Sequence, residues 1–236
     1  MSSSSSPSTI AVVGAGANLG LAIARRFGAA GHSVALISRN QAKLEALAAS
    51  LSDEGITARA YPADATDEKA LTGALKAASD EVGRIGVLSY SPAPVWDHSG
   101  GGLPDMATMG ITSTLETTPA SARASFDLAV GGALTAVAAV LPAMREARDG
   151  ALLFTTGRSA ITPMPILGNA GIAQAGLRNW AGAAHTELAP EGIYVGHMCI
   201  GLPILPGSGD GDPAAIADRW YHLSRARDTF ETTIGF

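Results

Sequence analysis

Short apolar runs rich in β-branched residues alternate with longer amphipathic stretches over most of the chain. The first half of the pattern predicts strands at residues 10–13, 33–38, 57–62 and 87–90, separated by helices at residues 19–30, 41–51 and 67–82. In the second helix, Leu44, Leu47, Ala48 and Leu51 recur at helical spacing. Such alternation is typical of a parallel sheet that is covered by helices on both faces.

The alternation stops between Ser91 and Thr118, a stretch rich in Gly, Pro, Ser and Thr. A loop of this length inside a compact domain is usually functional or mobile. Beyond it we expect a helix at about 121–148, a strand at 151–155, a helix at about 169–188, a strand at 194–200 and a last helix from Asp212-Pro213 onward. Asp favours the N-cap and Pro the first helical position. The pattern predicts one doubly wound α/β domain over residues 10–236, after a serine-rich leader at 1–9.

Composition narrows the class of protein. Of the 236 residues, 47% are hydrophobic and 16% are charged, which suits one compact domain with a large aliphatic core. The net charge is −5 and the 16 basic residues are scattered, so we expect no nucleic-acid partner. A single cysteine, Cys199, excludes a disulfide framework and fits a reducing cytoplasm. The histidines lack the spacing of metal ligands, so we expect no metal site.

Two segments bear on membranes and export. The longest uncharged apolar run, from Ala129 to Leu141, is shorter than the roughly 20 residues of a membrane span and predicts a buried helix instead. The leader has neither the basic nor the apolar region of a signal peptide. We therefore expect a cytoplasmic protein without a membrane partner.

A glycine-rich turn follows the first strand and opens the first helix. It comprises Gly14, Gly16, Asn18, Leu19 and Gly20. Glycines allow the tight turn and let backbone N–H groups and the helix N-terminus approach a pyrophosphate. Alone the turn is a weak signal, because a tight turn without a ligand looks the same.

The ends of the next strands strengthen the case for a dinucleotide. Arg39 ends the second strand, where the adenosine ribose would lie, and Arg suits a 2′-phosphate, so we expect NADP(H) rather than NAD(H). Asp64 and Ala65 end the third strand, where Asp64 would either meet the adenine or cap the following helix. Ser91, after the fourth strand, completes the predicted cofactor site.

Several tracts, taken together and in order, resemble the short-chain dehydrogenase/reductase family. They are the turn at 14–20, Ala63-Asp-Ala-Thr-Asp67, Leu141-Pro-Ala-Met144, Ala173-Gln-Ala-Gly-Leu177 and Thr186-Glu-Leu-Ala-Pro-Glu-Gly-Ile193. The resemblance implies a single Rossmann domain with about seven parallel strands and a nicotinamide cofactor. It also implies a homodimer or homotetramer built on the two long helices.

The same resemblance shows what is missing from the catalytic machinery. The family uses Asn, Ser, Tyr and Lys, and its Lys lowers the pKa of the Tyr that exchanges the carbonyl proton. Matching the tract at 173–177 puts Gln174 at the Lys position and Ala170 at the Tyr position, with the Ser near Thr156 or Gly157 and the Asn near Ala129. All three lysines precede residue 77 and no tyrosine lies between Tyr90 and Tyr194, so no register restores Tyr-x-x-x-Lys.

Other polar residues near the expected ends of strands four and five become candidates. The catalytic candidates are Thr156, which would hydrogen-bond a substrate oxygen, Arg158, which would bind an enolate or carboxylate, and Tyr90, which would replace the missing acid. The substrate-pocket candidates are Trp96, His98, Asn169 and Gln174. Each also has a purely structural interpretation, such as a strand-end threonine, a surface arginine or a packed tyrosine.

Three functions remain open at this point. The first is an atypical NADP(H)-dependent reductase acting on an activated C=C, C=N or carbonyl group of a small molecule, which demands less of an acid than a plain ketone does. The second is a non-redox enzyme (a cyclase, isomerase or lyase) with the cofactor structural or absent. The third is a non-catalytic partner or sensor.

Overall fold

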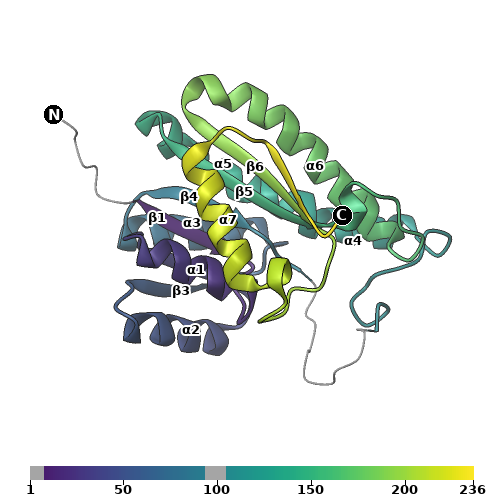
Figure 1. Ribbon diagram of the computed structural model, residues 1–236, viewed down its shortest axis with the longest axis horizontal. Coiled ribbons are helices and arrows are strands. Elements are labelled where there is room, and N and C mark those ends of the chain that lie inside the picture. Colours follow the sequence, from purple (N-terminus) through teal and green to yellow (C-terminus); the bar gives the residue numbers. More distant parts are fainter. Residues whose placement is uncertain (1–7, 94–104) are drawn as a thin grey trace.

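The computed structural model describes residues 8–93 and 105–236 and contains one sheet of seven parallel strands (Figure 1). The strand order across the sheet is β3-β2-β1-β4-β5-β6-β7. The strands are β1 (Thr9–Val13), β2 (Val34–Ser38), β3 (Ala58–Pro62), β4 (Ile85–Tyr90), β5 (Gly150–Gly157), β6 (Ile193–Ile200) and β7 (Glu231–Ile234). The order reverses between β1 and β4, where doubly wound sheets open a crevice for ligands.

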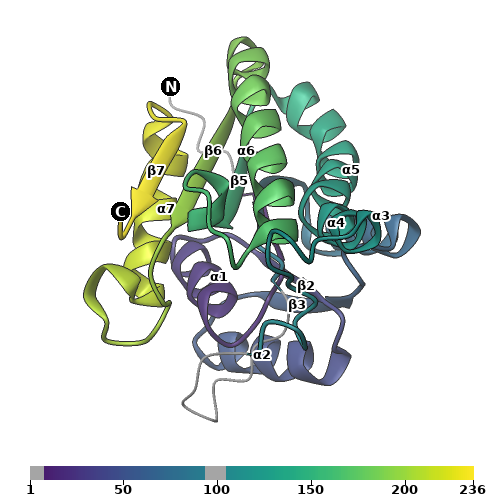
Figure 2. The same ribbon diagram turned by 90° about the vertical axis from the view of Figure 1, so that its right-hand side faces the viewer.

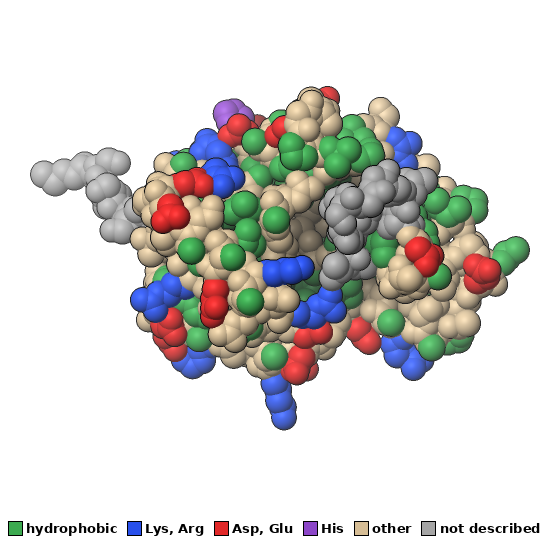
Figure 3. Space-filling view, turned by 90° about the horizontal axis from the view of Figure 1, so that it is seen from below, with side chains coloured by type: hydrophobic (Ala, Val, Ile, Leu, Met, Phe, Trp, Pro, Cys, Tyr) green, Lys and Arg blue, Asp and Glu red, His purple; other side chains and the backbone are tan. Residues whose placement is uncertain are grey.

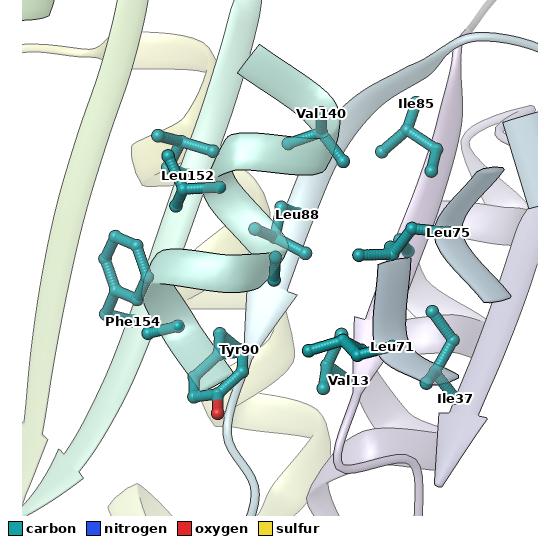
Figure 4. Close-up of a cluster of buried hydrophobic side chains, with 14 of the residues drawn as sticks. Val13, Ile37, Leu71, Leu75, Ile85, Leu88, Tyr90, Val140, Leu152 and Phe154 are labelled. Carbon is teal, nitrogen blue, oxygen red and sulfur yellow. The ribbon is translucent and has the colours of Figure 1, made fainter. Parts of the chain in front are cut away.

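Helices cover both faces of the sheet (Figure 2). Helices α1 (Leu19–Ala29), α2 (Gln41–Asp53) and α7 (Pro213–Ala226) pack on one face through residues such as Ile23, Leu44 and Trp220. Helices α3 (Glu68–Val82), α5 (Gly132–Ala147) and α6 (Gly168–Leu188) pack on the other. On that second face, Leu71 and Leu75 of α3 and Val140 of α5 meet Leu88, Tyr90, Leu152 and Phe154 of the sheet (Figure 4).

The predicted elements are present with ends that move by a few residues. Asp67 and Asp212 are the N-caps of α3 and α7, and their side chains accept from Ala70 N and Ala214 N. One helix differs in kind: the segment expected at 121–148 consists of α4 (Pro119–Phe126), a π turn η2 (Asp127–Gly131) and α5. The Tyr90 hydroxyl donates to the Leu128 carbonyl within this π turn, at 2.6 Å.

The segment Pro119–Ala147 is long and apolar enough, by length and composition, to cross a membrane, contrary to the expectation drawn from residues 129–141 alone. In the fold its α5 part buries Ala133, Ala136 and Val140 against the sheet, as the core helix of a globular domain does. Large apolar side chains nevertheless stay exposed around α4, α5 and the start of α6, namely Phe126, Leu134, Ile166 and Ile172. They lie where the expected homo-oligomer contact would form, and that expectation stays a prediction.

Candidate active site

The glycine turn lies at the carboxyl end of β1 and is closely covered by the chain that leaves β4. Gly14 has a φ of +91°, and a Cβ there would come within 2.7 Å of the backbone of Ser91 and Pro92. A Cβ on Gly20 would meet the Ala15 backbone at 2.9 Å, whereas one on Gly16 would meet nothing within 4 Å. The turn is therefore tight on its inner side and open at Gly16.

The first turn of α1 can accept an anion. No acidic residue lies in that turn, and although the Leu21 N–H donates to the Gly16 carbonyl at 2.9 Å, those of Leu19 and Gly20 have no acceptor among the described residues. Asn18, which the sequence placed in the cofactor site, does not cap the helix with its side chain but donates to the Ile204 carbonyl at 2.8 Å. Asn18 thus ties the turn to the segment that follows β6.

Arg39 and Asp64 come together at the ends of β2 and β3. The Asp64 carboxylate accepts from the N–H and hydroxyl of Thr66 at 2.9 and 2.8 Å, so it forms a local turn, while Asp67 caps α3. The Thr66 N–H, and to a lesser degree the Arg39 charge, hold the pKa of Asp64 below its usual value. Arg39 is exposed and makes no hydrogen bond or ion pair with any residue that the structure describes. In Figure 3 the surface seen from below is hollowed, and Lys or Arg side chains lie beside the hollow.

Gln174, which the family resemblance assigns to the Lys position, reaches the carboxyl end of β5. Its Oε1 accepts from Gly157 N at 2.9 Å and from the Ser159 hydroxyl at 3.1 Å. A Cβ on Gly157 would lie 3.3 Å from that same oxygen, so a side chain at 157 would contact residue 174. The two donors fix the amide orientation, and Nε2 has no acceptor among the residues that the structure describes.

Thr156 is 7% exposed and begins a chain of polar side chains that the sequence pattern does not predict, which is buried at Thr156 and His197 and partly exposed at its other end. Its Oγ1 lies 2.8 Å from His197 Nε2, and His197 Nδ1 lies 3.1 Å from Glu231 Oε2. Glu231 also forms a two-point ion pair with Arg178 of α6, with the second contact at 2.9 Å. Strands β5, β6 and β7 and helix α6 each contribute one member.

Two of the catalytic candidates, Tyr90 and Arg158, use their polar groups in contacts with the backbone. Tyr90 is 1% exposed, its hydroxyl is used by Leu128, and burial raises its pKa, so it acts as a packing residue. Arg158 turns toward the C-terminal residues: it donates to the Gly235 carbonyl, and its guanidinium lies 4.8 Å from the Phe236 ring centre. The structure thus supports the structural interpretation of both side chains.

Asn169 is fully buried, so it holds a loop and does not line a substrate pocket. Its Oδ1 accepts from Thr112 N at 2.9 Å, and its Nδ2 donates to the Gly110 carbonyl at 2.7 Å. Beside this loop lies a cavity of about 310 Å³, whose lining includes Thr114, Thr117, Ser159, Leu167 and Ile172. The remaining pocket candidates, Trp96 and His98, lie outside the described residues.

The buried chain predicts a loss of stability on acidification. Burial chiefly lowers the pKa of His197, and the hydrogen bond from Arg178 chiefly lowers that of Glu231. Both folded-state pKa values lie below the unfolded ones, so the stabilisation is complete above the unfolded His value of about 6.5 and declines as the pH falls through it. The Glu231 share is lost at lower pH, below about 4.3.

We therefore expect the free energy of unfolding, measured by urea denaturation, to fall between about pH 7 and pH 5. His197→Gln should reduce that decline, because the variant lacks this imidazole, and should leave the part due to His32, whose pKa burial also lowers. The exposed His222 offers a matched control, and His222→Gln should retain the decline. An equally steep decline in His197→Gln would contradict the assignment.

Comparison with known proteins places the chain in a family. The sequence pattern of the family described as short chain dehydrogenase matches residues 8–203, so the chain belongs to the short-chain dehydrogenase/reductase family. A very-long-chain 3-oxoacyl-CoA reductase of Aspergillus terreus is 29% identical over 185 residues, which cover 78% of this chain and 49% of that protein.

Solved structures share the whole fold. A short-chain dehydrogenase from Rhodopseudomonas palustris is 26% identical and superposes with a TM-score of 0.80 over 96% of this chain and 97% of its own. An NADPH-bound short-chain oxidoreductase from Pseudomonas aeruginosa PAO1, described as containing an atypical catalytic center, is 20% identical, with a TM-score of 0.81 over 98% and 96% of the two chains. The family and the single seven-stranded Rossmann domain expected from the sequence are thereby confirmed.

Proposed function

We propose that this chain is an atypical NADP(H)-dependent reductase of a small molecule with a polarised C=C, C=N or C=O bond. The proposal rests on a contrast between the cofactor-binding part and the catalytic part of the candidate site. The residues at the ends of β1, β2 and β3 form a cradle suited to a dinucleotide, whereas Gln174 offers only a neutral amide where the family has Lys. A substrate that is already activated suits such a centre.

The cofactor that the family implies fits the residues present. The open space at Gly16 and the unopposed N-terminus of α1 suit a pyrophosphate, and the exposed Arg39 guanidinium suits a 2′-phosphate. Asp64 keeps Oδ2 free of partners among the described residues, so it can accept from an adenine amino group. When bound, the nicotinamide supplies the hydride.

Gln174 would orient the substrate. Because its Oε1 is held by Gly157 and Ser159, its Nε2 is directed as a donor and can bind the electronegative atom of a polarised bond. An amide donor polarises that bond but cannot give up a proton, so this residue positions the substrate without acting as an acid.

The proposal is tested by incubating the protein with NADPH and a panel of ketones, enones and imines while the NADPH absorbance is followed. Binding of NADPH with its oxidation by at least one class of substrate is the expected result. Binding without oxidation, together with conversion of a substrate, would favour a cyclase, isomerase or lyase instead. Failure to bind either NADPH or NADH would contradict the proposal.

Replacing Arg39 by alanine should weaken NADPH far more than NADH. A charge-assisted contact to the 2′-phosphate is worth roughly 1–3 kcal/mol, and NADH has no such phosphate. Fluorescence titration of both nucleotides measures the difference. Arg25→Ala, which removes an exposed arginine paired with Glu54, is the control and should leave both affinities unchanged. Equal weakening of NADPH and NADH by Arg39→Ala would refute the 2′-phosphate role.

A further inference from the structure

The cavity of about 310 Å³ beside the loop at residues 110–118 has no part in the function proposed so far. One of its walls is this loop, and the other is formed by residues 159–167 and the first two turns of α6. The Thr114 N–H donates to the Pro165 carbonyl at 2.8 Å, which joins the two walls. A Cβ on Gly168 would lie 2.6 Å from Thr114 Cα, so the loop packs directly on the start of α6.

The cavity adjoins Gln174, the residue that positions the substrate in the proposed function. Ser159 lines the cavity, and its hydroxyl donates to Gln174 Oε1 at 3.1 Å. Ala175, the residue after Gln174, lines the cavity as well. A Cβ on Gly171 would lie 3.7 Å from Ser159 Cβ, so α6 and the chain after β5 meet at an ordinary contact distance. A substrate held by Gln174 can therefore place another of its parts in the cavity.

The lining of the cavity is mainly apolar. Its volume lies at the lower end of the roughly 300–1,000 Å³ that small-molecule sites occupy, and such sites combine apolar walls with a few polar groups. The larger apolar side chains are those of Ile161, Met164, Leu167 and Ile172, and the polar ones are the hydroxyls of Thr114, Thr117 and Ser159. The cavity thus suits an apolar group with at most a few polar atoms.

The three hydroxyl groups that line the cavity use their hydrogens within the protein. A hydroxyl has one hydrogen to donate and two lone pairs that accept. The acceptors are Gln174 Oε1 for Ser159, the Pro165 carbonyl for Thr114 and the Ser113 carbonyl for Thr117, at 3.1, 3.2 and 2.8 Å. To a molecule in the cavity these three side chains therefore offer acceptors and no donor.

The two walls carry no positive charge. Residues 105–122 contain two acidic residues and no Lys, Arg or His, and residues 159–177 contain no charged residue and no His. Arg158, which precedes the second wall, directs its guanidinium at the C-terminal residues. The Gly168 and Ala170 N–H groups, at the start of α6, already have acceptors within the protein. An anion in the cavity would meet no cationic side chain from either wall, and burying an unpaired charge is costly.

We infer that the cavity binds an uncharged, mainly apolar arm of the substrate while Gln174 positions the polarised bond. The inference rests on the proposed reductase function and deepens it by naming the substrate class: neutral compounds with an aryl or alkyl arm. An arm with a hydroxyl group also fits, because it can donate to the Ser159 oxygen or to a threonine oxygen. An arm with a carboxylate or phosphate is excluded, because it needs the donors and cations that the two walls lack.

The inference is tested with the full-length protein, NADPH and α-diketones that share one reacting group. 2,3-Butanedione has no arm, 1-phenylpropane-1,2-dione has a phenyl arm, and its 4-hydroxy and 4-carboxy derivatives add a donor or an anion to the ring. Gly171→Leu fills the cavity from α6, and Gly171→Ala fills less of it. Gly176→Leu is the matched control: Gly176 is exposed on the same helix outside the cavity lining, and its Cβ would meet only Val130 Cγ2, at 3.8 Å.

We expect the wild type to prefer the phenyl and hydroxyphenyl diketones over 2,3-butanedione by about tenfold or more in kcat/KM, as added carbon atoms do in an apolar pocket. The carboxyphenyl diketone should fall at least about tenfold below the phenyl one, because its charge would be unpaired. Gly171→Leu should abolish the preference for the phenyl arm, Gly171→Ala should reduce it, and Gly176→Leu should keep it. NADPH affinity measures folding, and if Gly171→Leu loses it, Gly171→Ala decides the comparison.

Two outcomes separate the cavity from the reductase function. If the diketones are reduced but Gly171→Leu keeps the wild-type preference, or the carboxyphenyl diketone matches the phenyl one, the cavity assignment is overturned and the reductase stands. If no diketone is reduced, the reductase function fails and the cavity is judged by ligand-observed NMR with 4-hydroxyacetophenone. Binding that Gly171→Leu loses and Gly176→Leu keeps would support the cavity, whereas equal binding by both variants would overturn it.

Discussion

Gly14→Ala should destabilise the protein by roughly 2–5 kcal/mol and abolish nucleotide binding. The left-handed backbone costs an L-residue about 1–2 kcal/mol, and forcing a methyl group into a closely packed site costs about 1–3 kcal/mol more. The φ of +91° and the 2.7 Å approach of the Ser91 and Pro92 backbone impose both costs at once. Because those neighbours are backbone atoms, relief would have to come from moving the chain that leaves β4.

Urea denaturation and NADPH titration of the same preparation measure the two effects. Gly73 provides a matched control, since it lies inside α3, where an added methyl group would meet no neighbouring atom within 4 Å. Gly73→Ala should stabilise the helix by about 0.5–1 kcal/mol and leave nucleotide binding intact. A Gly14→Ala protein of wild-type stability would show that the chain after β4 is not fixed against the turn.

Asn169→Ala should cost roughly 2–4 kcal/mol and loosen the loop at residues 110–121. The substitution leaves the Thr112 N–H and the Gly110 carbonyl without their buried partner, and each such group costs about 1–3 kcal/mol. The Asn169 amide also donates to the Ser121 carbonyl at 3.4 Å, near the start of α4. Its loss therefore releases the loop at both ends, beside the cavity that Thr114 and Thr117 line.

Limited proteolysis and urea denaturation test this prediction. Cleavage should begin within residues 110–121 and proceed faster than in the wild type. The same substitution at Asn40, the exposed N-cap of α2 that accepts from Lys43 N, should cost only about 0.5–2 kcal/mol and leave the loop resistant. Unchanged cleavage in Asn169→Ala would show that other contacts hold the loop.

Six of the seven strands could be predicted from the sequence because their apolar patterns are strong. The pattern located β1 to β6 and the main helices, and it identified Asp212 as a cap. It did not locate β7, since Glu231–Ile234 is four residues long and carries no alternation clear enough to stand out. It also could not reveal the π turn, which is a change of hydrogen-bond register and not of composition.

Only part of the candidate site could be predicted from the sequence, for a related reason. The glycine turn directly follows β1 and Arg39 directly follows β2, so the local sequence is enough to place both. His197, Glu231 and Arg178 depend on which strands are neighbours: Phe154 pairs with His197, and His197 pairs with Glu231. Strand alternation puts His197 and Thr156 on the same face once β5 and β6 are known to adjoin. That signal was present, but the partner on β7 required the structure.

The π turn between α4 and α5 changes which side of this long helical segment faces the sheet. Successive residues of an α-helix are rotated by about 100° around its axis, and a π turn contains one extra residue. The side chains of α4 are therefore rotated around the helix axis relative to those of α5. Accordingly α5 buries six residues against the sheet, while α4 buries none. The Leu128 carbonyl, which lies within the π turn, receives the Tyr90 hydroxyl. One segment thus serves two surfaces, the core through α5 and a separate outer face through α4.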